Sequence, residues 1–213
     1  MAKKITLIIQ ARFCILKHMQ PQAFVFFGII GSGKGTQVKL LVDFLKARDG
    51  LESVYAGTGE GFRQLVNSGN YTGSLVKETM ARGELVADFL TNAIFTNILI
   101  SSLTSEKNLV ADGYPRTVLQ SEEFDEMMQF YKHDKVNVIY IEVGKEEAMR
   151  RNLLRGRHDD TPEGIEKRFN EYQNNVIPAM NYFKDKKNYK IYTINGEQSK
   201  EAVHNDIIKA LGY

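Results

Sequence analysis

The sequence predicts an α/β fold in which a five-stranded parallel sheet carries helices on both faces. Two observations lead to this prediction. Short apolar runs alternate with segments of helical periodicity, and the first run leads into a glycine-rich loop that opens a helix. A chain of 213 residues is long enough for one such domain with a small inserted subdomain, whereas two full domains would be cramped.

The first strand is expected at residues 23–27, an apolar run that stops at Gly28, as a buried parallel strand would. A helix is expected at residues 34–48, where apolar residues recur at helical spacing until Asp49 and Gly50 end the pattern. The other strands are expected at residues 54–56, 109–111, 136–143 and 189–194. Because helical patterns separate them, we expect parallel pairing.

Two segments fall outside this alternation. Residues 58–104 form a polar and helical stretch that exceeds the roughly dozen residues of a simple crossover, so an inserted substrate-binding lobe is expected there. Residues 1–22 precede the first strand and are expected to form a short extra strand or an arm. Their apolar part, residues 5–9, is interrupted at Gln10 and Arg12, so a secretory leader is not expected.

Composition excludes several function classes. The 28 Lys and Arg residues nearly balance the 26 Asp and Glu residues, so bulk charge indicates neither a nucleic-acid nor a membrane partner. The single cysteine, Cys14, excludes an internal disulfide framework and an all-cysteine zinc site, and it favours a cytoplasmic protein. No apolar run approaches the roughly 20 residues that span a bilayer.

The loop after the first strand predicts a phosphate site. Residues 28–36 read Gly-Ile-Ile-Gly-Ser-Gly-Lys-Gly-Thr. Glycines let successive N–H groups turn toward one anion, the helix N-terminus adds positive potential, and Lys34 supplies a full charge to the phosphates. The strict pattern has Ser or Thr after the lysine, where this chain has Gly35 and then Thr36. Such a loop predicts a nucleotide binder, which could be a kinase, a GTPase or an ATPase.

Five separated motifs resemble, in order, those of the adenylate kinases, which are nucleoside monophosphate kinases. Residues 31–37 resemble the family's P-loop. The segment that holds the phosphate acceptor in that family resembles residues 58–60, Thr-Gly-Glu, together with Arg63. The stretch that cups the acceptor base resembles residues 83–86, Gly-Glu-Leu-Val. Residues 112–117, Asp-Gly-Tyr-Pro-Arg-Thr, followed by Gln120 are similar to the family's most recognisable motif. The last motif resembles the arginine set around the lid: Arg151, Arg155, Arg157, Asp159, Asp160, Arg168 and Tyr172.

The chain departs from the family pattern at a few positions. Tyr114 replaces the usual Phe, Ile30 replaces a common Pro, and Glu60 replaces Asp. Between Arg155 and Asp159 lie only three residues, so the resemblance implies a minimal lid. It further implies an N-terminal extension of residues 1–22, a P-loop core domain of residues 23–57 and 88–213, a small helical NMP-binding insertion of residues 58–87, and a vestigial lid loop of residues 156–160.

The resemblance implies the reversible, Mg²⁺-dependent reaction of ATP with AMP to give two ADP, without zinc. The implied catalytic residues are Lys34, Arg116, Arg155, Arg157 and Arg168. The implied ATP-binding residues are Gly31, Ser32, Gly33, Lys34, Gly35, Thr36, Arg151 and Gln198. The implied AMP-binding residues are Thr58, Arg63, Glu84, Leu85, Val86, Gly113, Tyr114, Pro115, Arg116, Gln120, Arg157 and Arg168. Asp112, at the end of a predicted strand, would hold water around the metal ion.

These residue types suit phosphoryl transfer, which needs in-line positioning and neutralisation of negative charge more than it needs proton transfer. Arg63, Arg116, Arg157 and Arg168 are expected to grip the acceptor and the transferring phosphates, because a guanidinium can hold two oxygens at once. Lys34 and Arg155 are expected to neutralise the donor. Arg151 is expected to stack on the donor adenine, whereas its neighbour Arg150 belongs to a solvated helix face.

Alternatives remain open at this point. Thr58 and Gln120 favour AMP, because pyrimidine-directed relatives carry Ala and Asn in the corresponding regions, but UMP or CMP is the second candidate. The short lid raises a non-catalytic nucleotide-binding regulator as a different class. A GTPase would need an Asn-Lys-x-Asp motif, which the chain lacks. We expect a monomer by default, or a homo-oligomer if a second subunit compensates for the short lid.

Overall fold

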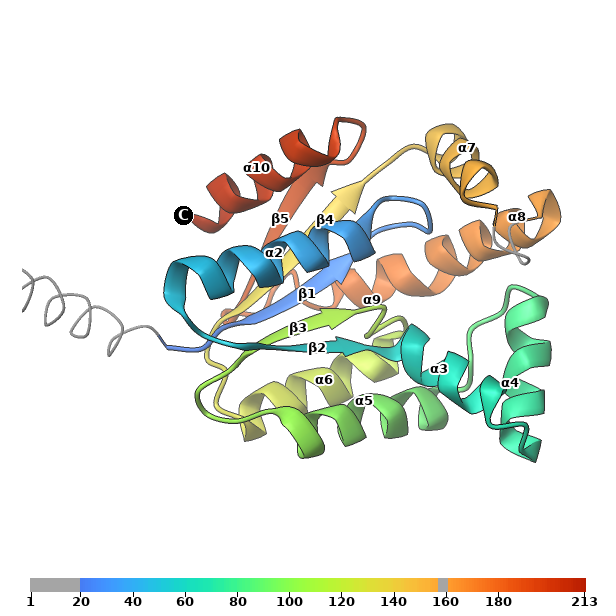
Figure 1. Ribbon diagram of the computed structural model, residues 1–213, viewed down its shortest axis with the longest axis horizontal. Coiled ribbons are helices and arrows are strands. Elements are labelled where there is room, and N and C mark those ends of the chain that lie inside the picture. Colours follow the sequence, from blue (N-terminus) through green and yellow to red (C-terminus); the bar gives the residue numbers. More distant parts are fainter. Residues whose placement is uncertain (1–19, 157–160) are drawn as a thin grey trace, which may run out of the picture.

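The computed structural model describes residues 20–156 and 161–213 (Figure 1). Its helices and strands alternate along most of the chain. In chain order the elements are β1 (Ala23–Phe27), α2 (Lys34–Asp49), β2 (Ser53–Gly57), α3 (Thr58–Asn67), α4 (Tyr71–Ala81), α5 (Asp88–Ser102), β3 (Asn108–Asp112), α6 (Val118–Phe130), β4 (Val136–Glu142), α7 (Lys145–Arg155), α8 (Pro162–Glu171), the π-helical turn η1 (Tyr172–Val176), α9 (Ile177–Asn181), β5 (Tyr189–Asn195) and α10 (Lys200–Leu211).

The five strands form one sheet in the order β2-β3-β1-β4-β5, and every neighbouring pair is parallel. The predicted fold class is therefore confirmed, and each predicted strand agrees with an observed one to within one residue at either end. β1 lies at the centre, and its five residues are all buried, which explains why it reads as an uninterrupted apolar run. All five strands end at the same edge of the sheet.

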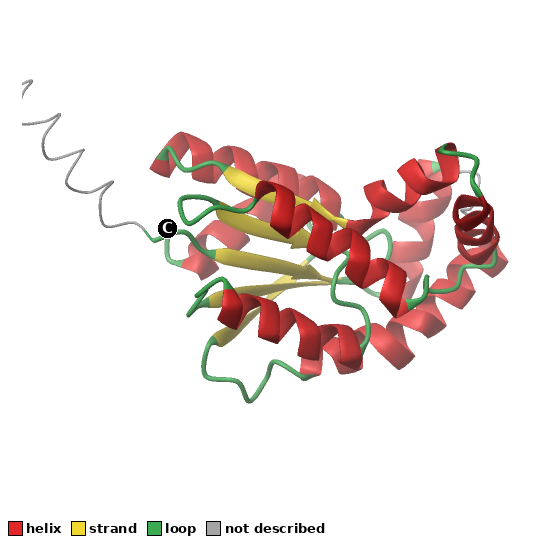
Figure 2. Ribbon diagram, turned by 90° about the horizontal axis from the view of Figure 1, so that it is seen from below, coloured by secondary structure: helices red, strands yellow, loops and turns green. Residues whose placement is uncertain are grey.

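Helices cover both faces of the sheet (Figures 1 and 2). On one face, Phe24 and Phe26 of β1 pack with apolar residues of α2 and α10. On the other face, Val25 and Phe27 pack with apolar residues of α5, α6 and α9. The two-residue alternation of β1 thus divides its side chains between two cores. Among the described helices, none has the length and apolar character that crossing a membrane requires.

Two helical pairs stand beyond the carboxyl ends of the strands, α3 with α4 and α7 with α8 (Figure 1). Gly57 ends β2, and Thr58 begins α3 directly. α7 is capped by Gly156 in the left-handed conformation, and α8 starts after Thr161, whose side chain accepts a hydrogen bond from the Gly164 N–H. Four residues of the predicted lid loop, 157–160, lie outside the described residues, as do residues 1–19 of the predicted extension.

Candidate active site

The loop between β1 and α2 has the backbone of an anion cradle. Gly31 and Gly33 have φ values of +85° and +91°, which glycine adopts readily and other residues rarely do. Gly33 is the N-cap residue of α2. Because glycine has no side chain, it offers no side-chain acceptor to the first N–H groups of the helix. A ligand anion can accept from these groups. Gly31 also fits tightly against α7, since an added Cβ would come within 2.5 Å of Asn152 Nδ2.

The ammonium group of Lys34 lies against this loop. Its Nζ donates to the carbonyl oxygen of Gly28 at 2.5 Å and to that of Ile29 at 2.9 Å. Burial lowers the pKa of Lys34 to about 8, although the carboxylate of Asp112 opposes the shift, and Arg116 and Arg155 lower the pKa further. A bound anion would favour the charged lysine again. Lys34 therefore lies in an environment where a bound phosphate group would stabilise its charged form.

Asp112 ends β3 beside β1 and β2, where its register partners are Phe26 and Gly57. Its Oδ2 would lie 3.8 Å from a Cβ added at Gly35, so the carboxylate faces the start of α2. The hydroxyl of Tyr55 donates to the same oxygen at 3.3 Å. Mg²⁺ prefers oxygen ligands, keeps several waters, and is usually held by one or two carboxylates together with substrate phosphates. A single carboxylate facing a phosphate loop fits that requirement.

No cage that could hold a metal without a substrate is present in the described part of the chain. Residues 20–156 and 161–213 contain no group of three or more His, Cys, Asp or Glu side chains placed to share an ion. Structural zinc needs four such ligands, and catalytic zinc needs three. Within the described residues, the lone carboxylate of Asp112 beside the phosphate loop suits a Mg²⁺ ion that arrives with a nucleotide.

Arg116 follows Asp112 on the turn that leads to α6. Its Nε donates to the Gly113 carbonyl at 2.8 Å, and its backbone N–H donates to Gln120 Oε1 at 2.8 Å. Burial lowers the pKa of the guanidinium, the nearby Asp112 raises it, and the positive charge of Arg168 lowers it. A guanidinium stays charged nonetheless. Because the positive charge of Arg168 acts on Arg116, an anion between the two would be favourable.

Most of the predicted catalytic and acceptor residues line one cavity of about 260 Å³, which we call the central cavity. It brings together side chains from the P-loop, α3, the segment before α5, the turn after β3, α7 and α8. The residues from the predicted site that line it are Lys34, Arg63, Glu84, Leu85, Val86, Gly113, Pro115, Arg116, Arg155 and Arg168. Five of these are cations, so the cavity is suited to several phosphate groups.

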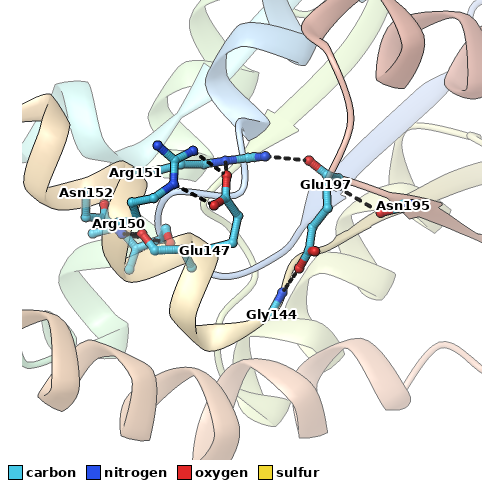
Figure 3. Close-up of polar contacts among 10 residues, drawn as sticks. Gly144, Glu147, Arg150, Arg151, Asn152, Asn195 and Glu197 are labelled. Atoms are coloured by element: carbon cyan, nitrogen blue, oxygen red, sulfur yellow. Dashed lines mark hydrogen bonds and ion pairs between the residues drawn. The ribbon is translucent and has the colours of Figure 1, made fainter.

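The predicted adenine side of the donor lies at a second cavity, the donor-side cavity. From the predicted site it is lined by Ser32, Gly33, Thr36, Arg151 and Gln198. Arg151 Nε donates to Glu147 at 2.6 Å, and Arg151 Nη2 donates to the Gly196 carbonyl at 3.0 Å, which holds the guanidinium between α7 and the loop after β5 (Figure 3). Arg150, which is 61% exposed, pairs only with Glu147 among the contacts of the described residues.

The side chains of three residues predicted to bind AMP do not line the central cavity. The ring of Tyr114 is 1% exposed and stacks on Phe95 with the ring centroids 4.1 Å apart. The hydroxyl of Thr58 donates to the Gly113 carbonyl at 3.0 Å. The amide of Gln120 accepts from the Arg116 N–H and donates to Asp88 Oδ1 at 2.7 Å. Thr58 and Gln120 thus brace the turn that carries Arg116. Arg157 lies outside the described residues.

The sequence motifs do not include the apolar wall of the central cavity, which contains Phe26, Phe62, Met80 and Val176. Phe26 lies near the carboxyl end of β1, where ligands of parallel sheets bind. Phe62 directly precedes Arg63 on α3, and helical spacing from Gly59 puts Phe62 on the same face. Apolar side chains are the usual lining of a nucleotide site, around a few polar groups. Periodicity alone does not distinguish such a wall from a core.

Comparison with known proteins gives consistent similarities. The sequence model of the family described as adenylate kinase matches residues 26–188. The chain is 32% identical to the adenylate kinase of Thermosipho africanus, over 88% of this chain and 98% of the relative. It is 30% identical to adenylate kinase 1 of a Nostoc species, over 88% of this chain and 97% of the relative. It is 34% identical to an adenylate kinase of Prochlorococcus marinus, over 76% of this chain and 84% of the relative.

Proposed function

The chain belongs to the adenylate kinase family of phosphotransferase enzymes, and we propose that it transfers the γ-phosphoryl group of ATP reversibly to AMP, with Mg²⁺, to give two ADP. The observation that carries the proposal is the convergence of Lys34, Arg63, Arg116, Arg155 and Arg168 on one cavity beside a phosphate loop. An acceptor that is already an anion needs neutralisation and alignment, which these cations supply.

The two cavities support separate positions for the two nucleotides. The P-loop lies between them, since Lys34 lines the central cavity while Ser32, Gly33 and Thr36 line the donor-side cavity. We infer that the donor adenine lies near Arg151 and Gln198, with its phosphates along the P-loop toward Lys34. AMP then lies in the central cavity, with its base near Leu85 and Val86 and its phosphate near Arg63 and Arg116.

The chemistry proposed for this chain consists of binding, orientation and charge stabilisation. Lys34 and Arg155 would neutralise the donor phosphates, and Arg116 and Arg168 would hold the transferring group, because guanidinium groups accommodate two oxygens at once. Asp112 would hold Mg²⁺ through water, and the ion when bound adds positive charge to the donor phosphates. The AMP phosphate attacks as an anion, so a general base has no proton to remove.

Gln120 and Thr58 would act on AMP indirectly in this proposal. Both hold the turn from Gly113 to Arg116, through hydrogen bonds to the Gly113 carbonyl and to the Arg116 N–H. Selection of AMP over UMP or CMP stays a prediction, and among the described residues of the site no feature favours the pyrimidine nucleotides or a non-catalytic regulator. We further propose that the protein acts in a reducing cytoplasm, as its single cysteine suggests, and acts as a monomer.

A steady-state assay tests the proposal. Purified protein is mixed with Mg²⁺ and ATP, and ADP formation is followed with AMP, UMP, CMP, GMP or no acceptor. We expect AMP-dependent turnover that falls at least about a hundredfold in Lys34→Ala and in Arg116→Ala, as removal of one transition-state donor does. Glu146→Gln, at an exposed position of α7 that lines neither cavity, serves as the control and should retain activity. Preference for UMP or CMP would overturn the acceptor, and nucleotide binding without transfer would overturn the enzyme.

A further inference from the structure

Tyr55 lies at the carboxyl edge of the sheet although it belongs to none of the family motifs. It is 43% exposed and comes two residues before the end of β2. Val54 and Ala56 pack into the core under α5, so the alternation of the strand turns Tyr55 to the opposite face. Asp112 lies on that face as well, because Val110, two residues earlier in β3, packs against α2. The Tyr55 hydroxyl donates to Asp112 Oδ2 at 3.3 Å.

Gly57 is what allows the Tyr55 ring to reach Asp112. Gly57 is the register partner of Asp112 on the neighbouring strand. A Cβ added at Gly57 would lie 2.3 Å from the Tyr55 hydroxyl oxygen and 2.4 Å from Cζ, so the ring lies across the glycine. The backbone of Gly57, with φ of −106°, is one that any residue adopts. Glycine is therefore needed there for the ring and not for the backbone.

We propose that Tyr55 is a positioning residue that orients the Asp112 carboxylate toward the start of α2. This deepens the proposed function and rests on it, because the carboxylate matters through the Mg²⁺ ion that accompanies ATP. By donating to Oδ2, the phenol fixes the rotation of the carboxylate next to Gly35. An ion held through water depends on the direction of that carboxylate, as groups behind a metal ligand generally determine its geometry.

Glu60 and Arg63 of α3 are the other charged groups close enough to influence the Tyr55 hydroxyl. Because α3 also carries part of the acceptor site, the competing reading is that Tyr55 contacts AMP. Tyr55 does not line the central cavity, whereas Arg63 does. The two readings predict different kinetics: orientation of Asp112 affects the dependence on Mg²⁺, and contact with AMP affects the KM for AMP.

The test uses Tyr55→Phe, which keeps the ring and removes the hydroxyl. ADP formation is measured against free Mg²⁺ at saturating ATP and AMP. We expect the free Mg²⁺ that gives half the maximal rate to rise about tenfold, at the lower end of the losses seen for groups behind a metal ligand, with the KM for AMP unchanged. Gly57→Ala should shift it in the same direction, because the added Cβ displaces the ring. Tyr71→Phe, at a 79% exposed tyrosine of α4, is the matched control and should change nothing.

A binding titration keeps this inference separate from the kinase reaction. Calorimetry with the β,γ-imido analogue of ATP gives a Kd with Mg²⁺ and a Kd in EDTA. We expect Tyr55→Phe to weaken only the Mg²⁺ complex. Equal Mg²⁺ dependence in wild type and Tyr55→Phe, or a raised KM for AMP alone, would overturn the positioning role. If wild type transfers no phosphoryl group to AMP, the proposed function fails, and the titration still decides whether Tyr55 acts on the Mg²⁺ complex.

Discussion

At the scale of the residue, Tyr114 combines a favourable ring with an unfavourable hydroxyl. The ring stacks on Phe95 and packs edge-on to Phe124 in the core. The hydroxyl is buried, and among the described residues it has no hydrogen-bond partner. A buried polar atom without a partner keeps the cost of its lost hydration. The ring of Tyr114 therefore stabilises the core, and its buried hydroxyl offsets part of that stabilisation.

We predict that Tyr114→Phe stabilises the protein by about 1 kcal/mol, because it removes the unpaired hydroxyl and keeps the stack. Urea unfolding followed by circular dichroism measures the change. Tyr189→Phe is the matched comparison, since the buried Tyr189 hydroxyl donates to Asp125 at 2.9 Å and its loss should destabilise by a similar amount. Destabilisation by both substitutions would mean that the Tyr114 hydroxyl has a partner after all.

At the scale of the element, the buried side chain of Asn152 joins α7 to the P-loop by a hydrogen bond. Asn152 is 0% exposed, and its Nδ2 donates to the Ile30 carbonyl at 3.0 Å and to the Ala148 carbonyl at 2.7 Å. Ile30 stands where the family commonly has proline. Asn152 thus holds the loop against the helix that also carries Arg151 and Arg155, so the P-loop and these two arginines are positioned together.

We predict that Asn152→Ala raises the KM for ATP by about tenfold, since the Ile30 carbonyl loses its buried partner at a cost of about 1.4 kcal/mol. The KM for AMP should change less, because the hydrogen bonds of Asn152 go to the P-loop and to its own helix, whereas α3 and the segment before α5 form the proposed AMP side. Initial rates at varied ATP and varied AMP measure both constants. Glu146→Gln, at an exposed position of the same helix that lines neither cavity, is the control. Equal increases in the two KM values would contradict a local effect on the P-loop.

The elements differ in how far their sequence revealed them. The central strand β1 could be predicted because burial on both faces leaves an uninterrupted apolar run, and α2 could be placed because its apolar residues recur at helical spacing until Gly50 ends it. The Asn152 contact could not be predicted, since its partner lies 122 positions away in the sequence. For the same reason, Gln120 reads locally as a free amide, although it donates to Asp88, 32 positions earlier. Sequence spacing indicates local structure, and such pairings depend on the assembled fold.

At the scale of the whole molecule, stability in acid should depend on a network at the edge of the sheet opposite the active site. Asp125 of α6 is 7% exposed and accepts hydrogen bonds from Lys186 at 2.5 Å and from Tyr189 at 2.9 Å. Burial raises the pKa of the Asp125 carboxyl, but the hydrogen bonds from Lys186 and Tyr189 outweigh it and hold the pKa below its ordinary value. The charged carboxylate joins α6 to β5 and the loop before it.

A depressed pKa means that Asp125 contributes stability above the pKa of the unfolded chain, about 3.9, and that this contribution is lost as the pH falls through the folded-state pKa. We predict that Asp125→Asn destabilises by about 2 kcal/mol at pH 7 and by progressively less below about pH 4. Urea unfolding at pH 7 and at about pH 3 measures both differences. Asp134→Asn, at an exposed position, should change stability little at either pH. A difference for Asp125→Asn that is independent of pH would refute the assignment.

The whole molecule places a donor-side and a central cavity on the two sides of one P-loop, at the carboxyl edge of a parallel sheet. This arrangement accounts for a reaction between two nucleotides. Lys34 and Arg116 line the central cavity, and the Asp112 carboxylate faces the start of α2. The sequence motifs identified the cations of this arrangement, because charged residues recur at fixed positions in the family motifs. They did not identify its apolar wall or the bracing by Tyr55, Asn152 and Gln120, because packing and long-range hydrogen bonds create both.

The most direct test of the central claim uses ADP as the only nucleotide. Purified protein is incubated with Mg²⁺ and ADP, and the nucleotides are separated by ion-exchange chromatography over time. Transfer between two adenine nucleotides predicts that ATP and AMP appear in equal amounts until equilibrium, and that Lys34→Ala slows the appearance of both by at least about a hundredfold. ADP that remains unchanged, or that is consumed with release of inorganic phosphate and without ATP, would contradict the account.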